Sequence, residues 1–172
     1  HHQLACKAAE ESAVLLKNNN GLLPLNKTDK IAFIGRFAEA PRYQGGGSSH
    51  INSFRVDSAL EAAEKSGLKG ITYAPGYEAD GVTTNSELLE AALKAAKEAK
   101  VAVIFAGLPD SYESEGYDRT TLDLPACQNE LIEKVCAVQP NTVVVLHNGS
   151  AVSMPWIDKV PSVLEMYLGG EG

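Results

Sequence analysis

The sequence predicts an α/β fold, a three-layer sandwich in which a mostly parallel, flavodoxin-like sheet of about five to six strands is flanked by helices. Short apolar runs alternate with segments whose apolar residues repeat at the helical period. Strands that alternate with single helices form βαβ units, and their right-handed crossovers cover both faces of a parallel sheet. With 172 residues, 44% of them hydrophobic, the chain is expected to form one soluble globular domain over residues 1–172.

The expected elements follow from these periods. Thr84 and Glu87 have the spacing of a capping box that opens a helix, and Pro125 is favourable in a first helical turn because its missing N–H has no partner there. The expected helices are 2–17, 56–63, 84–99 and 125–138. The expected strands are 31–35, 71–74, 101–106, 142–146 and 162–167. In the common strand order 2-1-3-4-5, ligands bind at the carboxyl edge between the first and third strands.

Charge and motif content exclude several classes of function. The formal net charge is -7 and no block of Lys and Arg is present, so we expect no nucleic-acid partner and no binding to anionic membranes. The longest apolar runs, 101–106 and 142–146, are far shorter than the roughly 20 residues of a membrane span. Gly35 is followed by Arg36 rather than by further glycines, and no Walker A motif is present, so nucleotide cofactors receive little support.

The three cysteines, Cys6, Cys127 and Cys136, have no metal-ligand spacing. Cys127 and Cys136 lie on one expected helix about half a turn out of phase, so they cannot form a disulfide with each other. We expect small buried side chains in a reducing compartment, no metal and no cofactor. Together with the lack of a leader segment before His1, this favours a cytoplasmic location, while secretion stays open because the chain starts without Met.

Two chemically suggestive loops leave the first and third expected strands. The loop 44–50 contains three glycines that allow close backbone approach to a ligand and two serine hydroxyls that suit sugars or phosphates. The loop 112–119 concentrates carboxylates, which is typical of a solvated surface. Alternatively, neighbouring carboxylates raise the pKa of one carboxyl group so that it can donate a proton near neutral pH. We expect Asp118 and Arg119 to form an ion pair that shapes this loop.

Two other residues are assigned structural roles. His147 ends the fourth expected strand, but no serine or cysteine motif accompanies it, so we expect a structural, hydrogen-bonding histidine. Trp156 is expected in the core rather than under a sugar ring.

Six motifs follow one another along nearly the whole chain: 9–18 (AEESAVLLKN), 21–25 (GLLPL), 45–49 (GGGSS), 114–119 (SEGYDR), 122–125 (LDLP) with Gln128, and 148–150 (NGS). Taken in this order, they resemble glycoside hydrolase family 3. The resemblance is to the second domain of β-glucosidase-type members, an α/β sandwich that packs against an N-terminal (β/α)8 barrel of the same polypeptide.

The resemblance implies a retaining glycosidase whose Asp nucleophile lies on the barrel. The general acid/base is implied to be Glu115, with Glu113 as the rival because a two-residue slip of this loop is open. Ser48 and Gly47 are implied to contact the sugar. Because retaining chemistry needs two carboxyl groups about 5–5.5 Å apart, the chain without its barrel is not expected to turn over substrate.

Several alternatives stay open at this point. The sugar could be a xyloside, an arabinoside or an N-acetylglucosaminide, the chain could be a non-catalytic carbohydrate-binding module, or it could be a flavodoxin-like nucleotide-binding domain. The implied partners are β-linked glucosides or oligosaccharides, the barrel domain and, as an alternative to a monomer, a second copy in a homodimer.

Overall fold

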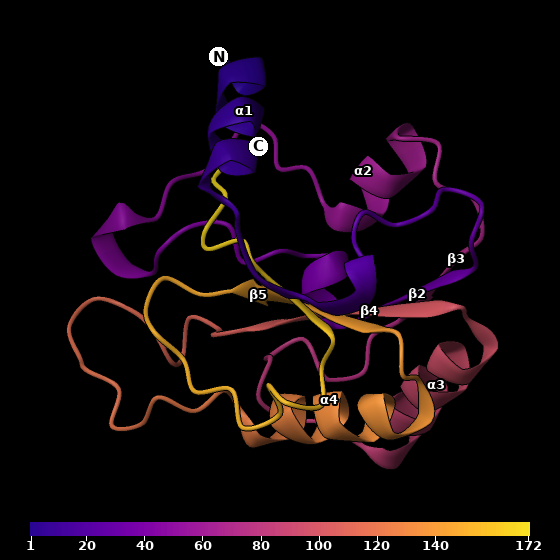
Figure 1. The fold of residues 1–172 in the computed structure, drawn as a ribbon. Helices are drawn as coiled ribbons and strands as arrows, with labels where there is room; N and C mark the ends of the chain where they lie inside the picture. Colours follow the sequence, from indigo (N-terminus) through magenta and orange to yellow (C-terminus); the bar gives the residue numbers. More distant parts are fainter.

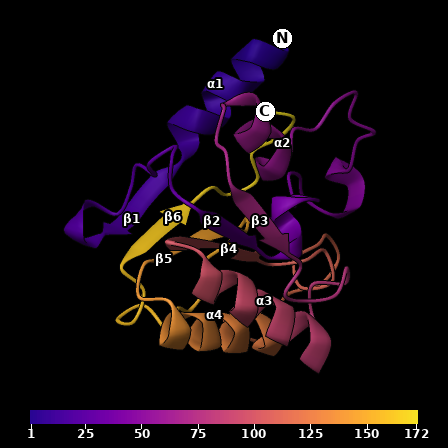
Figure 2. The ribbon, with the colours of Figure 1, turned by 90° about the vertical axis from the view of Figure 1, so that its right-hand side faces the viewer.

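The computed structural model describes all residues from His1 to Gly172 and contains one six-stranded sheet with the order β1-β6-β5-β4-β2-β3. Neighbouring strands are parallel except for β1, which pairs antiparallel with β6 at one edge of the sheet (Figure 2). The strands are β1 (Val14–Asn18), β2 (Ile31–Ile34), β3 (Ile71–Ala74), β4 (Val101–Gly107), β5 (Thr142–His147) and β6 (Ser162–Glu165).

Helices cover both faces of the sheet, so the predicted three-layer α/β sandwich is confirmed (Figure 1). Helices α3 (Ser86–Glu98) and α4 (Ala126–Val138) lie on one face, and α1 (His2–Ser12) and α2 (Ala59–Lys65) lie on the other. Each of these helices is too short to reach across a lipid bilayer.

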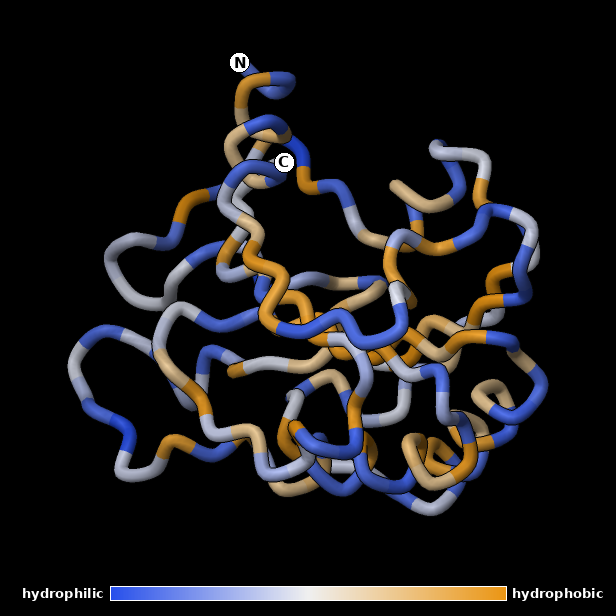
Figure 3. Tube along the Cα trace, viewed as in Figure 1, coloured by the Kyte–Doolittle hydropathy of each residue, from blue (hydrophilic) through white to orange (hydrophobic).

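The central strands read as continuous apolar runs because both of their faces are covered. Alternate residues point to opposite layers: Ala102 and Ile104 pack with α3 and α4, whereas Val103 and Phe105 pack with the other layer. All seven residues of β4 are buried. Figure 3 shows the resulting hydrophobic centre with polar segments around it.

The expected order 2-1-3-4-5 is confirmed for the five strands that the sequence predicts, since these are β2 to β6 and lie in the order β3-β2-β4-β5-β6. The carboxyl ends of β2 and β4 are therefore neighbours. The loops that leave these two strands lie at the edge where parallel sheets bind ligands.

The first helix is shorter than predicted. It ends at Ser12, and residues 14–17 of the expected helix instead belong to β1, with Val14 opposite Glu165 and Asn18 opposite Ser162. Only Ala9 of α1 is buried, so its apolar periodicity reflects little packing. Pairing with β6 gives residues 14–18 backbone hydrogen bonds and covers an edge strand that would otherwise be open.

Three helix starts also differ from prediction: α2, α3 and α4 begin at Ala59, Ser86 and Ala126 rather than at residues 56, 84 and 125. Asn85, not Thr84, is the N-cap of α3: its side chain accepts a hydrogen bond from Leu88 N at 2.9 Å, while the Thr84 hydroxyl donates to Gly76 O at 2.8 Å. Pro125 precedes α4 as its N-cap instead of lying in its first turn. The capping box of this protein opens α2, where Ser58 and Glu61 hydrogen bond reciprocally.

All three cysteines are free. The expectation that they are buried holds for Cys127 only, because Cys6 and Cys136 are partly exposed. Burial raises the pKa of the Cys127 thiol to about 11.

Candidate active site

The loops that follow β2 and β4 are in direct contact at the carboxyl edge of the sheet. The backbone N–H of Ser48 donates to Glu115 Oε2 across 2.6 Å. A Cβ atom placed on Gly46 would lie 2.7 Å from Ser114 Oγ and 3.1 Å from Ser114 Cβ, so a larger residue would have to displace the Ser114 side chain. The predicted convergence of these loops is confirmed.

Gly47 is required at this contact for two reasons. Its φ is +80°, in the left-handed region that L side chains rarely adopt, and a Cβ atom on it would lie 2.4 Å from Glu115 Cβ. Gly47 thereby lets the Ser48 N–H reach the carboxylate of Glu115.

Glu115 is solvent-exposed, as are Gly47 and Ser48. Hydrogen bonds from the side chain and the backbone of Ser48 hold the pKa of Glu115 below its ordinary value. The expectation of a carboxyl group in the loop 112–119 with a raised pKa is wrong for this chain, because hydrogen-bond donors face its glutamates and stabilise the charged form. The carboxyl group with a raised pKa belongs to Glu165 on β6. Burial raises the pKa of Glu165, and the nearby charge of Glu113 raises it further.

Glu113, the rival candidate, is a half-buried structural carboxylate. Its side chain is 19% exposed. Its Oε2 accepts from Gly149 N at 2.9 Å, and its Oε1 accepts from the Ser150 hydroxyl. Burial alone would raise the pKa of Glu113, but the hydrogen bonds from Ser150, Gly149 and Arg42 outweigh it and lower the pKa below the ordinary value.

Arg42, which the sequence did not single out, binds Glu113 from the β2 side. The guanidinium is 5% exposed and donates to Glu113 Oε2 at 2.5 Å and to Asp110 Oδ1 at 3.1 Å. It also donates to the carbonyl oxygens of Leu108 at 2.7 Å and of Glu113 at 2.9 Å. The sequence around Arg42, which lies two residues before the loop 44–50, contains no pattern that predicts burial of its side chain.

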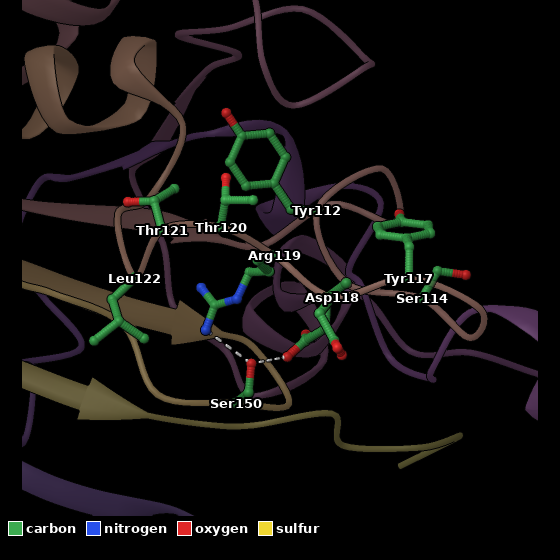
Figure 4. Close-up of a pocket in the computed structure, with 10 residues that line it drawn as sticks. Tyr112, Ser114, Tyr117, Asp118, Arg119, Thr120, Thr121, Leu122 and Ser150 are labelled. Atoms are coloured by element: carbon green, nitrogen blue, oxygen red, sulfur yellow. Dashed lines mark hydrogen bonds between the residues drawn. The ribbon is translucent and has the colours of Figure 1, made fainter.

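The expected ion pair between Asp118 and Arg119 is not formed. Arg119 instead donates to Ser150 Oγ at 3.0 Å (Figure 4). It also donates to the carbonyl oxygen of Ala151. Adjacent residues point in different directions here, so Arg119 ties the loop after β4 to the loop after β5 while Asp118 stays exposed. An open pocket of about 440 Å³ lies beside this contact, between Tyr112, Tyr117, Arg119 and Ser150.

His147 and Trp156 both have structural surroundings. The His147 ring packs 5.8 Å from Phe37 and 6.2 Å from Phe105 between ring centroids, and its buried Nε2 has no hydrogen-bond partner. The expected hydrogen-bonding role of His147 is therefore wrong, since aromatic packing surrounds it instead. Burial lowers the pKa of His147 to about 4. Trp156 is fully buried in the core, as predicted.

Comparison with known proteins places this fold and these loops in a family. The model of the Glycosyl hydrolase family 3 C-terminal domain matches residues 13–172. The chain is 56% identical to thermostable beta-glucosidase B of Acetivibrio thermocellus over 99% of its own length and 23% of that protein. It is 44% identical to an exo-alpha-(1->6)-L-arabinopyranosidase of Bifidobacterium longum, covering 99% of this chain and 24% of that protein.

The solved structures agree with this placement. The crystal structure of the Bifidobacterium adolescentis GH3 beta-glucosidase superposes with a TM-score of 0.92 at 45% identity, over 98% of this chain and 25% of that one. The chain thus spans about a quarter of the length of the relatives it matches. The chain belongs to the glycosyl hydrolase family 3 C-terminal domain family.

Proposed function

We propose that Glu115 is the general acid/base of a retaining β-glucosidase that hydrolyses terminal β-D-glucosyl residues, with Ser48 and Gly47 contacting the sugar. One observation carries this choice: Glu115 is exposed on the outer side of the loop contact, whereas Glu113 is enclosed by donors from two other loops. A proton donor must lie within hydrogen-bond reach of the leaving oxygen, and an exposed carboxyl can meet that condition. The relatives' beta-glucosidase names support the substrate class.

The second carboxyl group of the mechanism is proposed to lie on a barrel domain of the same polypeptide. Protonated Glu115 gives its proton to the glycosidic oxygen while the nucleophilic carboxylate forms a bond to the anomeric carbon and the aglycone leaves as an alcohol. Ionised Glu115 then takes a proton from water, whose oxygen displaces the nucleophile and releases the sugar with retained configuration.

The first half of this cycle needs Glu115 in its protonated form. In the chain by itself, the Ser48 hydrogen bonds favour the ionised form. Docking of a barrel would bury Glu115 and bring a second carboxylate near it, and both effects raise the pKa of a carboxyl group. We therefore infer that the proton donor is completed only in the assembled enzyme.

The test compares Glu115→Gln and Glu113→Gln in the full polypeptide with an aryl β-glucoside. Glu115→Gln is expected to lower kcat/KM by roughly 10²–10⁴-fold and to abolish the limb of the pH profile that reports the acid. In Glu113→Gln, the limb of the pH profile that reports the acid is expected to persist, even if kcat/KM falls. Disappearance of the limb in Glu113→Gln, with an intact limb in Glu115→Gln, would transfer the role to Glu113.

The arabinopyranosidase relative favours a second candidate function, an exo-glycosidase that acts on a pentoside such as a xyloside or an arabinoside. It keeps Glu115 in the same role. Comparison of kcat/KM for aryl glucoside, xyloside and arabinopyranoside by the full polypeptide decides between the two, since the acid/base proposal holds for each of them.

A further inference from the structure

Glu113 connects the loops that leave three neighbouring parallel strands. It lies in the loop after β4, and its carboxylate accepts from Arg42 in the segment after β2 and from Gly149 and Ser150 after β5. Arg42 completes the connection, because its remaining donors bind Leu108 O, Glu113 O and Asp110 along the β4 loop. The pair therefore fixes where this loop stands relative to the segment after β2.

The same two segments meet a second time at the candidate site. Ser48 lies six positions after Arg42, and Glu115 lies two positions after Glu113. In the Arg42–Glu113 pair the arginine is buried and the glutamate half-buried, whereas the hydrogen bond from Ser48 N to Glu115 is exposed. Displacement of the buried contact must be transmitted to the exposed one, because only residue 114 separates the two glutamates.

We propose that the Arg42–Glu113 ion pair positions Glu115 for proton transfer, so that Arg42 and Glu113 are positioning residues of the active site. This inference rests on the proposed role of Glu115. Arginine is suited to the task because its planar guanidinium holds donors in a rigid fork, and here it binds two carboxylates and two carbonyl oxygens at once. A lysine keeps the charge but presents it as a flexible point without the fork.

A positioning role and a purely stabilising role make different predictions. If Arg42 acts by positioning Glu115, substitution of Arg42 should not lower the activity of an enzyme that already lacks the Glu115 carboxyl group. If Arg42 only stabilises the fold, its substitution impairs enzymes with and without that carboxyl alike. The dependence of the Arg42 effect on Glu115 therefore separates the two roles.

The experiment uses the full polypeptide in four forms: the parent, Arg42→Lys, Glu115→Gln and the double variant. The substrate is 2,4-dinitrophenyl β-glucoside, whose leaving group needs little protonation, so that turnover by Glu115→Gln stays measurable, and a poorer phenyl leaving group is measured in parallel. With the phenyl substrate, Arg42→Lys is expected to lower kcat roughly 10²-fold with little change in KM, the size that a 1 Å misplacement costs. In the Glu115→Gln background, measured with the dinitrophenyl substrate, Arg42→Lys should change kcat by no more than about twofold.

Arg36→Lys is the matched control. Arg36 also follows β2, but it pairs with Glu39 at 3.4 Å, and no hydrogen bond or ion pair joins it to either loop of the site. Circular dichroism and thermal unfolding check the fold of each variant. If Arg42→Lys does not fold, Ser150→Ala removes a different donor to Glu113, and the same Glu115-dependent pattern is expected with a smaller amplitude.

Equal losses from Arg42→Lys in both backgrounds, or no loss in the parent, would overturn the positioning role while Glu115→Gln still shows its own defect. If Glu115→Gln keeps full activity with the phenyl substrate, the proposed acid/base assignment itself fails. The two failures are thus distinguished within one set of enzymes.

Discussion

The backbone N–H of Ser48 lies 2.6 Å from Glu115 Oε2 and joins two loops that are 67 positions apart in the chain. This contact exists because β2 and β4 are adjacent parallel strands whose carboxyl ends share one edge. It brings together Glu115, Ser48 and Gly47, the residues that the proposed function assigns to catalysis and sugar contact.

Replacement of Gly47 should damage the site beyond its effect on stability. In Gly47→Ala, the new methyl group must displace Glu115, since its Cβ would lie 2.4 Å from Glu115 Cβ, and the positive φ adds about 1–2 kcal/mol of strain. We expect kcat of the full polypeptide to fall roughly 10–100-fold. Gly67→Ala is the control, because Gly67 has φ +79° but nothing lies within 4 Å of its added Cβ. Equal activities of the two variants at similar stability would contradict this account.

Gln128 should contribute to stability through a buried connection between α4 and the sheet. Its side chain accepts from Gly107 N at 2.8 Å and donates to Gly81 O at 2.7 Å, and it is fully buried. Gln128→Leu leaves the buried Gly107 N–H without a partner and leaves Gly81 O with only the Cys127 thiol, 3.8 Å away, so we expect a loss of about 2–4 kcal/mol in the free energy of unfolding. Urea denaturation of the 172-residue chain measures it. The exposed control Glu130→Leu should change the free energy by less than about 0.5 kcal/mol, and an equal change in both would refute the role of Gln128.

The stability of the chain should fall with acid because of His147. Its pKa is about 4 in the folded chain and 6.5 as an ordinary value, so the unfolded chain binds more protons between these pH values. The stabilisation is complete above pH 6.5, declines as the pH falls toward 4, and is lost below it, with a total of roughly 3 kcal/mol. Unfolding free energies from pH 3 to 8, compared with those of His147→Gln, isolate this contribution. Parallel curves for the two proteins would show that His147 does not titrate as described.

The sheet order was predictable from sequence because the strands are short apolar runs and one α-helix follows each of β2, β3 and β4. The strand order also places the two loops that meet at Ser48 and Glu115 at one edge of the sheet. The position of these loops does not depend on which residue caps α3, so the incorrect prediction of Thr84 in place of Asn85 does not affect it.

Features that depend on tertiary partners were not predictable. Residues 14–17 continue a helical apolar pattern, but their conformation is set by pairing with β6, which lies about 150 positions away. Arg42 binds residues 66 to 71 positions away, and no local signal marks such a partner. For the same reason the pKa of Glu113 follows from Ser150, Gly149 and Arg42 rather than from the neighbouring acidic residues that the sequence shows.

Azide rescue tests the central claim about Glu115 most directly. In the full polypeptide, Glu115→Ala removes the carboxyl that activates water, and azide can attack the glycosyl-enzyme without such a base. We predict that azide restores turnover of 2,4-dinitrophenyl β-glucoside by Glu115→Ala and yields β-glucosyl azide, while Glu113→Ala gives no azide product. Formation of β-glucosyl azide by Glu113→Ala, with none from Glu115→Ala, would contradict the assignment.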